Sequence, residues 1–326
     1  MRAVQITRFM HSRWLVLIMA LALVCVAMTA YTNIPVEYLA GDRGLVLPSA
    51  NLWIPNPHTA MWVNIGATLG LAALMVVLNR SYNLLRTMTL LDASLFLAMS
   101  MSTPWLLVQF YTGTPLCITL IVCTLLLYST YQNPCRRKRI FLIFFLLSAM
   151  TMTQYCYAVY IPVFIIGSMQ MRIFSIKTLI AIILGTITPW WMMLGSGLVT
   201  VSDIHIPDFG NMFGTFYLVD NLQLLVAVLI SATVLVAGWC LNFPRMIAYN
   251  AHMRAYNGTM SVLSLVTLIA LCADFINLPA YAPVLFMCAS FYMGRMFAAQ
   301  ASPKSYIPIT TIFLIYATLL TWSLIP

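Results

Sequence analysis

The fold class of this chain is decided by long, uninterrupted apolar runs. The first of them reads WLVLIMALALVCVAMTAY and extends from Trp14 to Tyr31. An α-helix needs about 20 apolar residues to cross the hydrocarbon layer of a bilayer. Arg2, Arg8 and Arg13 precede the run, as in a signal peptide, but the run is longer than the usual signal-peptide core and no A-x-A cleavage site follows it. We therefore expect a retained first helix whose N-terminus is cytoplasmic.

The composition extends this interpretation to the whole chain. Of the 326 residues, 62% are hydrophobic and only 7% are charged, whereas an ordinary soluble domain is about 25% charged. So few charges could not cover a water-soluble globule, and they exclude disordered, collagen-like and nucleic-acid-binding chains. The continuous runs also argue against a membrane β-barrel, whose strands alternate apolar and polar residues. We expect an all-α, polytopic bundle of transmembrane helices.

Further apolar runs follow the first and bring the expected number of spans to about eleven. They cover residues 58–79, 87–103, 114–131, 140–154, 156–171, 177–197, 217–241, 258–273, 280–296 and 306–325. Since crossings of about 20 residues use most of the chain, we expect a single transmembrane domain over residues 1–326 and no separate soluble domain.

The runs 140–154 and 156–171 are short, so they are compatible with one long helix or with a hairpin of two helices. Charge distinguishes these alternatives, because cytoplasmic loops of membrane proteins are enriched in Lys and Arg. A hairpin places all of the 16 basic residues except Arg43 on the cytoplasmic side, and all of the 7 acidic residues except Asp92 on the outer side. We therefore expect the hairpin, an outer C-terminus, and a multi-pass protein of a bacterial inner membrane with the lipid bilayer as a partner.

Ionisable residues inside a bilayer are costly and often mark functional sites. Asp92 is either an acid stabilised by the positive end of a helix dipole or a proton or cation site. Arg295 is expected near the cytoplasmic end of its helix, with its guanidinium reaching out to the lipid phosphates. No expected span carries the paired charges of proton-driven transporters, which argues against an ion-coupled carrier.

The first expected outer loop, 32–57, is the richest polar segment of the chain. Glu37 or Asp42 in this loop is a candidate general base at the membrane face. The alternative is an interfacial loop in which Trp53 and Tyr38 rest at the level of the lipid headgroups and the acids are merely solvated.

The second expected outer loop contains the pattern Asp203-x-His205-x-x-Asp208. Carboxylate oxygens and imidazole nitrogens are metal-ligand types. No further segment offers an obvious ligand apart from Glu37 or Asp42, so a polar loop without a metal is favoured. Whether the protein uses a cofactor is unknown from the sequence.

The pattern Gly66-x-x-x-Gly70 in the second run is typical of close helix contact. In a protein with many spans this usually means internal packing. Gly185 and Pro189 indicate a kinked helix in the run 177–197.

Five stretches resemble segments of a family of polytopic inner-membrane proteins of the Bacteroidota with no assigned activity. They cover residues 78–87, 95–97, 141–148, 172–177 and 184–189. The likeness covers most of residues 58–300 and implies the same multi-pass architecture. Where that family often has a proline in its third helix, this chain has Asp92.

The arrangement of the N-terminal half is similar to that of membrane glycosyltransferases that use lipid-phosphate sugars. An acid-bearing outer loop follows the first helix, and short helices and the basic turn Arg136–Arg139 come later. In those enzymes an acid of the first outer loop is catalytic, which by position implies Glu37 or Asp42. This chain departs from them because it has no firm acidic motif and no soluble outer domain.

The leading hypothesis for function is therefore work on a lipid-linked or envelope substrate at the outer leaflet. The alternatives are a non-catalytic scaffold subunit that binds other envelope proteins, and a carrier. The enzyme predicts a cavity that opens from loop 32–57 into the bilayer, whereas the scaffold predicts a filled interior.

Overall fold

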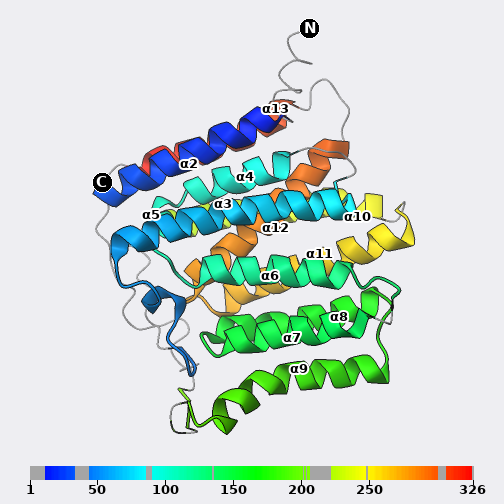
Figure 1. Cartoon of the computed structure of the whole chain (residues 1–326). Coiled ribbons are helices and arrows are strands. Elements are labelled where there is room, and N and C mark those ends of the chain that lie inside the picture. Colours follow the sequence, from blue (N-terminus) through cyan, green and yellow to red (C-terminus); the bar gives the residue numbers. More distant parts are fainter. Residues whose placement is uncertain are drawn as a thin grey trace.

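The computed structural model describes residues 12–33, 44–85, 90–133, 136–200, 202, 204–205, 222–246, 249–299 and 306–324. Within these ranges the chain is helical and contains no strand, which confirms the all-α class. The helices lie side by side in a stacked bundle (Figure 1). They are α2 (Arg13–Asn33), η1 (Ala50–Leu52), α3 (Pro57–Tyr82), α4 (Leu91–Met101), α5 (Pro104–Val108), α6 (Gly113–Tyr128), α7 (Arg137–Thr151), η3 (Tyr155–Tyr160), α8 (Ile161–Gln170), α9 (Ile176–Gly195), α10 (Leu222–Met246), α11 (Ala251–Ala273), α12 (Leu278–Ala299) and α13 (Tyr306–Leu324).

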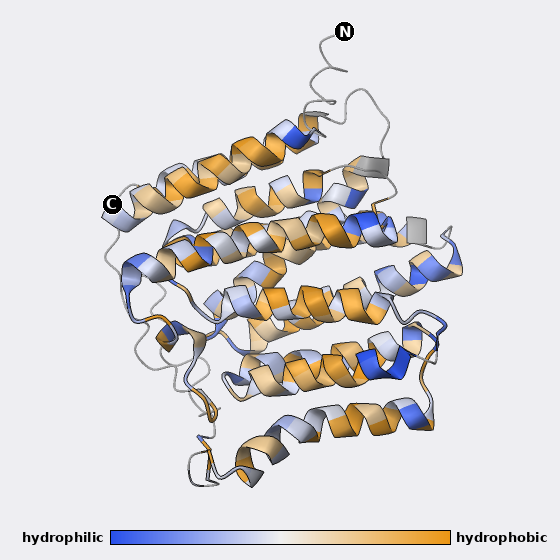
Figure 2. Cartoon of the chain, viewed as in Figure 1, coloured by the Kyte–Doolittle hydropathy of each residue, from blue (hydrophilic) through white to orange (hydrophobic). Residues whose placement is uncertain are grey.

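Every expected span contains a helix. Six of the described helices are long and apolar enough to cross a membrane by length and composition: α2, α3, α9, α10, α11 and α13. Apolar residues occupy the middle of the helices, and hydrophilic residues gather toward their ends (Figure 2). This is the pattern of a helix bundle whose solvent is a lipid layer between two aqueous phases.

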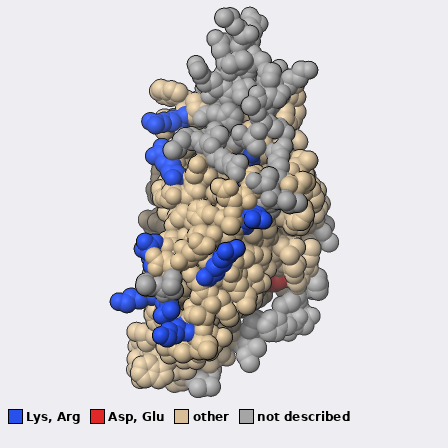
Figure 3. All heavy atoms as spheres, turned by 90° about the vertical axis from the view of Figure 1, so that its right-hand side faces the viewer, with Lys and Arg blue, Asp and Glu red and all other residues tan. Residues whose placement is uncertain are grey.

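The two ends of the bundle differ in charge. At one end, α3, α6 and α8 finish and α4, α7, α9 and α11 begin, on the right of Figure 1. Seen face on, this end carries many Lys and Arg side chains (Figure 3). We call it the basic end, and the other end the opposite end. The described α2 begins at the basic end and α13 finishes at the opposite end.

The expected hairpin is confirmed, because α7 and α8 are separate helices that lie side by side (Figure 1). The connection between them includes η3, a short 3₁₀ segment. Two expectations were too simple. The run 87–103 is broken at Ser102 into α4 and α5, and α11 begins at Ala251, earlier than the expected 258. Its added first turns at the basic end include His252, Arg254 and Asn257, so hydrophobicity alone did not assign them to a span.

Asn64 on α3 stabilises the interrupted segment between α4 and α6, which contains α5. Its Nδ2 donates to the carbonyl oxygens of Leu106 and Leu107, at 2.7 and 3.1 Å, and its Oδ1 accepts from Thr114 Oγ1 at 2.7 Å. The side chain is 1% exposed. Backbone groups freed by a helix break inside an apolar layer need such partners. Asn64 supplies donors to two of these carbonyl groups and so stabilises the interruption.

Close helix contact occurs at a different glycine from the one expected. A Cβ on Gly66 or Gly70 would meet nothing within 4 Å, and both residues are exposed, so the expectation of internal packing there is wrong. At Gly185 of α9, a Cβ would lie 2.7 Å from the carbonyl oxygen of Phe141 and 3.0 Å from Cβ of Phe144 on α7. The absence of a side chain at Gly185 lets α7 and α9 touch.

This contrast predicts opposite effects for one substitution at two glycines. Gly185→Ala forces α9 away from the α7 backbone, and overpacking of this kind costs about 1–3 kcal/mol. Gly70→Ala fills open space and gains about 0.5–1 kcal/mol of helix propensity. Thermal unfolding of the purified proteins in detergent should show a lower midpoint for the first and an equal or higher one for the second. A midpoint for Gly185→Ala equal to that of wild type would contradict the α7–α9 contact.

Candidate functional site

Asp92 lies in the first turn of α4, as one of the two expectations for it requires. Its carboxylate lies in the first turn, at the positive end of the helix dipole, which is the dipole-stabilised arrangement. The side chain is nevertheless only 2% exposed, and its Oδ1 has no hydrogen-bond partner among the described residues. A capping acid at a helix start is ordinarily solvated. Asp92 is therefore both a first-turn acid and a buried one.

Helix α12 passes directly against Asp92. A Cβ on Gly294 would come within 3.0 Å of Cβ and 3.2 Å of Cα of Asp92. Only a glycine lets α12 approach α4 this closely, so the backbone of α12 at Gly294 covers one side of Asp92.

A small cavity borders Asp92 on the inside of the bundle. It is enclosed by side chains of α3, α4, α6, α11 and α12 together with Leu84. Its lining residues are Met75, Leu78, Asn79, Leu84, Asp92, Ile121, Thr124, Met260, Met287 and Phe291. The free space accommodates about one water molecule. Most of the wall is apolar, so the carboxylate is the dominant polar group there.

A second cavity lies farther along α3, α4, α6 and α12, where α5 also contributes to its wall. Its lining residues are Thr68, Leu71, Phe96, Ser100, Thr103, Leu106, Leu107, Tyr111, Thr114, Pro283 and Phe286. On α4, Asp92 faces the first cavity, and Phe96 and Ser100 face the second. Residues four apart share one face of a helix, so both cavities follow one seam. Neither is lined by a residue from the described part of loop 32–57.

Arg295 is the second buried charge in this region. It is 3% exposed, and its guanidinium carbon lies 4.5 Å from the ring centroid of Tyr249. The expectation that Arg295 reaches outward is therefore wrong, because α4, α6 and α10 enclose its helix. Nearby, Asn242 donates to the carbonyl oxygen of Tyr292 at 3.1 Å. The basic end thus holds a buried polar layer.

The candidates of the outer loops are only partly visible. Glu37, Asp42, Asp203 and Asp208 lie outside the described residues. His205 is described, and its backbone N–H donates to the carbonyl oxygen of Leu45 at 2.8 Å. Among the described residues no group of three or more His, Cys, Asp or Glu side chains could hold a metal ion.

The loop segment after Asp42 is attached to the bundle. The backbone N–H groups of Val46 and Leu47 both donate to the carbonyl oxygen of Met152, at 2.9 and 3.0 Å. Together with the His205 bond, this brings the two expected outer loops and the end of α7 into contact. The sequence did not predict this meeting, because no pattern connects residues so distant in the chain.

Sequence reasoning also missed a buried acid at the opposite end. Asp274 is 5% exposed. Its carboxylate accepts from Asn277 Nδ2 at 3.1 and 3.0 Å and from the Tyr281 hydroxyl at 3.1 Å. Asn277 Oδ1 in turn accepts from Gln154 Nε2 at 2.9 Å. This network ties the start of α12 to the α7–η3 turn. The polar residues Gln154 and Tyr155 in an apolar region were a signal for a buried network. The sequence did not indicate that Asn277 would be the partner of Gln154.

No family model, curated protein or solved structure matches the chain. The two resemblances noted in the sequence stay predictions.

The Asp274 network predicts a graded loss of stability. Asp274→Ala removes the acceptor of two side chains, and bonds to a charged group contribute about 1.5–3 kcal/mol each. Tyr281→Phe removes a single donor and should cost less. Thermal unfolding in detergent should rank wild type above Tyr281→Phe, and Tyr281→Phe above Asp274→Ala. If Asp274→Ala matches wild type, the network does not hold the turn.

Proposed function

We propose that the protein crosses a bacterial inner membrane about eleven times, with a cytoplasmic N-terminus and an outer C-terminus. Successive helices run in opposite directions, and the basic side chains gather at one end (Figures 1 and 3). The positive-inside rule then assigns the basic end to the cytoplasm. Short helices such as α4 and α6 are surrounded by longer neighbours, which supports their inclusion among the crossings.

This topology predicts which side of the membrane each exposed loop faces. Leu52 in η1 and Ser175 before α9 are both exposed and lie at opposite ends of the bundle. In a variant without reactive native cysteines, a membrane-impermeant thiol reagent added to intact cells should label Leu52→Cys and spare Ser175→Cys. Permeabilised cells should show labelling of both. The reverse pattern in intact cells would refute the orientation.

We propose further that the protein is a carrier that takes up a proton or a small cation within the bundle. The observation that carries this proposal is Asp92, a buried carboxylate at a cavity among apolar helices, whose Oδ1 has no hydrogen-bond partner among the described residues. Ionisable groups in such surroundings most often serve ion or proton pathways. The broken α4–α5 helix beside the second cavity adds support, since interrupted helices commonly line transport sites.

The room at Asp92 is suited to a proton or a cation with at most a little water. The first cavity accommodates about one water molecule. Asp92, Asn79 and Thr124, each of which carries a side-chain oxygen, are among its lining residues, and oxygen ligands suit small hard cations. The second cavity continues the seam toward the opposite end, with Ser100 and Thr103 on its wall.

Proton flux into proteoliposomes tests the carrier proposal. With a pH-sensitive dye trapped inside and a potassium diffusion potential applied, wild type should acidify the lumen faster than empty vesicles do. Asp92→Asn, which keeps the size of the side chain, should reduce the flux at least about tenfold. A Glu37→Gln/Asp42→Asn double variant serves as the matched control and should retain it. Flux in wild type no faster than in empty vesicles would overturn the proposal.

Infrared spectra give a second readout that does not depend on transport. Between alkaline and acid pH, wild type should gain a carbonyl band from a protonated carboxyl group in apolar surroundings. Asp92→Asn should lack this band, whereas Asp274→Asn should keep it, because hydrogen bonds from Asn277 and Tyr281 surround Asp274. An unchanged band in Asp92→Asn would show that Asp92 is not the proton-binding group.

An enzyme that acts on a lipid-linked substrate at the outer leaflet is the second candidate. One observation favours it: the described segment 45–47, in the same expected outer loop as the two candidate acids, is hydrogen-bonded to Met152 at the end of α7 and to His205. Removal of a general base usually costs 10²- to 10⁴-fold in rate. The variants can be tested for complementation of a strain that lacks the gene. If Glu37→Gln or Asp42→Asn fails to complement at normal protein levels while Asp92→Asn complements, the enzyme is favoured. Full complementation by all three variants would favour a scaffold.

A further inference from the structure

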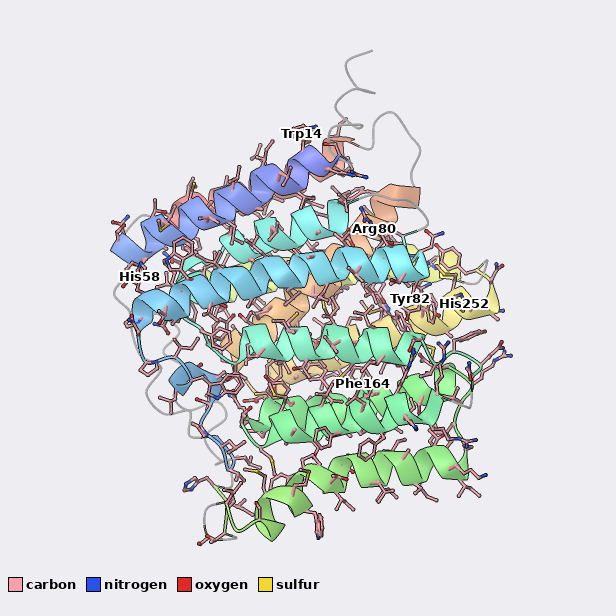
Figure 4. All side chains as sticks on the ribbon, in the orientation of Figure 1. Trp14, His58, Arg80, Tyr82, Phe164 and His252 are labelled. Atoms are coloured by element: carbon pink, nitrogen blue, oxygen red, sulfur yellow. The ribbon has the colours of Figure 1, made fainter. Side chains whose placement is uncertain are left out.

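Aromatic rings from three segments converge at the basic end. Tyr82 ends α3, Tyr131 follows α6, and His252 and Tyr256 lie in the first turns of α11. The ring centroids of Tyr131 and His252 are 4.7 Å apart, those of His252 and Tyr256 are 4.2 Å apart, and those of Tyr82 and Tyr256 are 5.3 Å apart. We call these four residues the aromatic cluster. Tyr82 and His252 are seen together at this end in Figure 4.

The cluster has a buried base and an accessible rim. Tyr256 is 2% exposed and stacks on Tyr128 with centroids 4.2 Å apart. The two tyrosines are locked by a reciprocal pair of bonds, in which each hydroxyl donates to the carbonyl oxygen of the other residue, at 2.8 and 3.1 Å. Tyr82 and Tyr131 are half-buried, and His252 is exposed. The rim therefore stands on a rigid contact between α6 and α11.

Positive charge borders the cluster. The charges of Arg139 and Arg136, at the start of α7, act on the Tyr82 hydroxyl group. Arg136 is also tethered, because its Nη1 donates to the carbonyl oxygen of Ser129. A guanidinium has five N–H donors, so this bond leaves others for a ligand. The only acids in the described part of the chain, Asp92 and Asp274, are both buried and do not offset this surface charge.

Basic residues at this end are expected from the positive-inside rule alone, and that rule explains their number. It does not explain why rings from α3, α6 and α11 meet beside two of them. Tyrosine and histidine edges suit the headgroup layer of a bilayer, where one side is apolar and the other is wet. Arginine forms paired hydrogen bonds with phosphate oxygens. The combination fits a phosphodiester at the level of the headgroups.

We infer that the aromatic cluster, with Arg136 and Arg139, binds the phosphate of an anionic phospholipid from the adjoining leaflet. The guanidinium groups hold the phosphate oxygens, and the rings of Tyr131 and His252 pack on the glycerol and upper acyl region. Basic sites between helices at the cytoplasmic face are a common form of lipid recognition. This site is independent of the proposed transport at Asp92, because it lies on the surface of the bundle.

The test uses the full chain purified in detergent, with unfolding followed by tryptophan fluorescence. Phosphatidylglycerol should raise the unfolding midpoint of wild type, whereas phosphatidylcholine and inorganic phosphate should not. Arg136→Gln/Arg139→Gln should need an about tenfold higher phosphatidylglycerol concentration for the same rise, as expected for a loss of about 1.4 kcal/mol of binding free energy. Lys138→Gln/Lys177→Gln removes the same charge from exposed positions at the same end and should respond as wild type does.

A second variant keeps the test decisive if the arginine variant fails to fold. His252→Gln changes an exposed rim residue and should also weaken the response to phosphatidylglycerol. An equal loss in both double variants would reveal diffuse attraction and overturn the inference. An equal rise with inorganic phosphate would point to a free anion in place of a lipid, and an equal rise with phosphatidylcholine to general solubilisation; either result would also overturn it.

Discussion

The fold depends on one constraint: inside an apolar layer, every backbone N–H and C=O group must find a partner within the protein. Continuous helices satisfy it at once, which is why each long apolar run contains a helix. The exceptions need help from side chains. Asn64 donates two hydrogen bonds to carbonyl oxygens of α5 and accepts a third from Thr114 at the start of α6. Without such partners, an interruption in this part of the bundle would leave carbonyl groups in apolar surroundings with no hydrogen bond.

The same constraint separates polar residues that are explained from those that are not. The hydrogen bonds of Asn64 stabilise the interrupted α4–α5 segment, and those of Asn277 connect α12 to the α7–η3 turn. Asp274 is enclosed by donors from Asn277 and Tyr281. Asp92 differs, because one of its oxygens has no partner among the described residues although it is buried. A charge that contributes so little to local structure is the strongest sign of function in the described part of the molecule.

The two ends of the bundle divide the remaining chemistry. At the opposite end, loop segments around Leu45 and His205 are bonded to each other, and the Asp274 network fastens the neighbouring turn. At the basic end, Arg295 is buried while Arg136 and Arg139 stand at the surface beside a group of tyrosines. The seam of α3, α4, α6 and α12 connects the two ends, with both cavities along it.

The sequence by itself determined the helical class, the positions of the helices and the hairpin at 140–171, because hydrophobic length and charge asymmetry are local signals that the bilayer reads segment by segment. It also placed Asp92 in a first turn. The tertiary structure decided everything that depends on which helices touch. Gly185, and not Gly66, makes a close contact; Arg295 is enclosed and does not reach outward; and Asn277, which donates to Asp274, accepts a hydrogen bond from Gln154 across more than a hundred residues. A helix that is apolar all round gives no periodic sign of its inner face, so burial and partnership emerge only when the helices are packed.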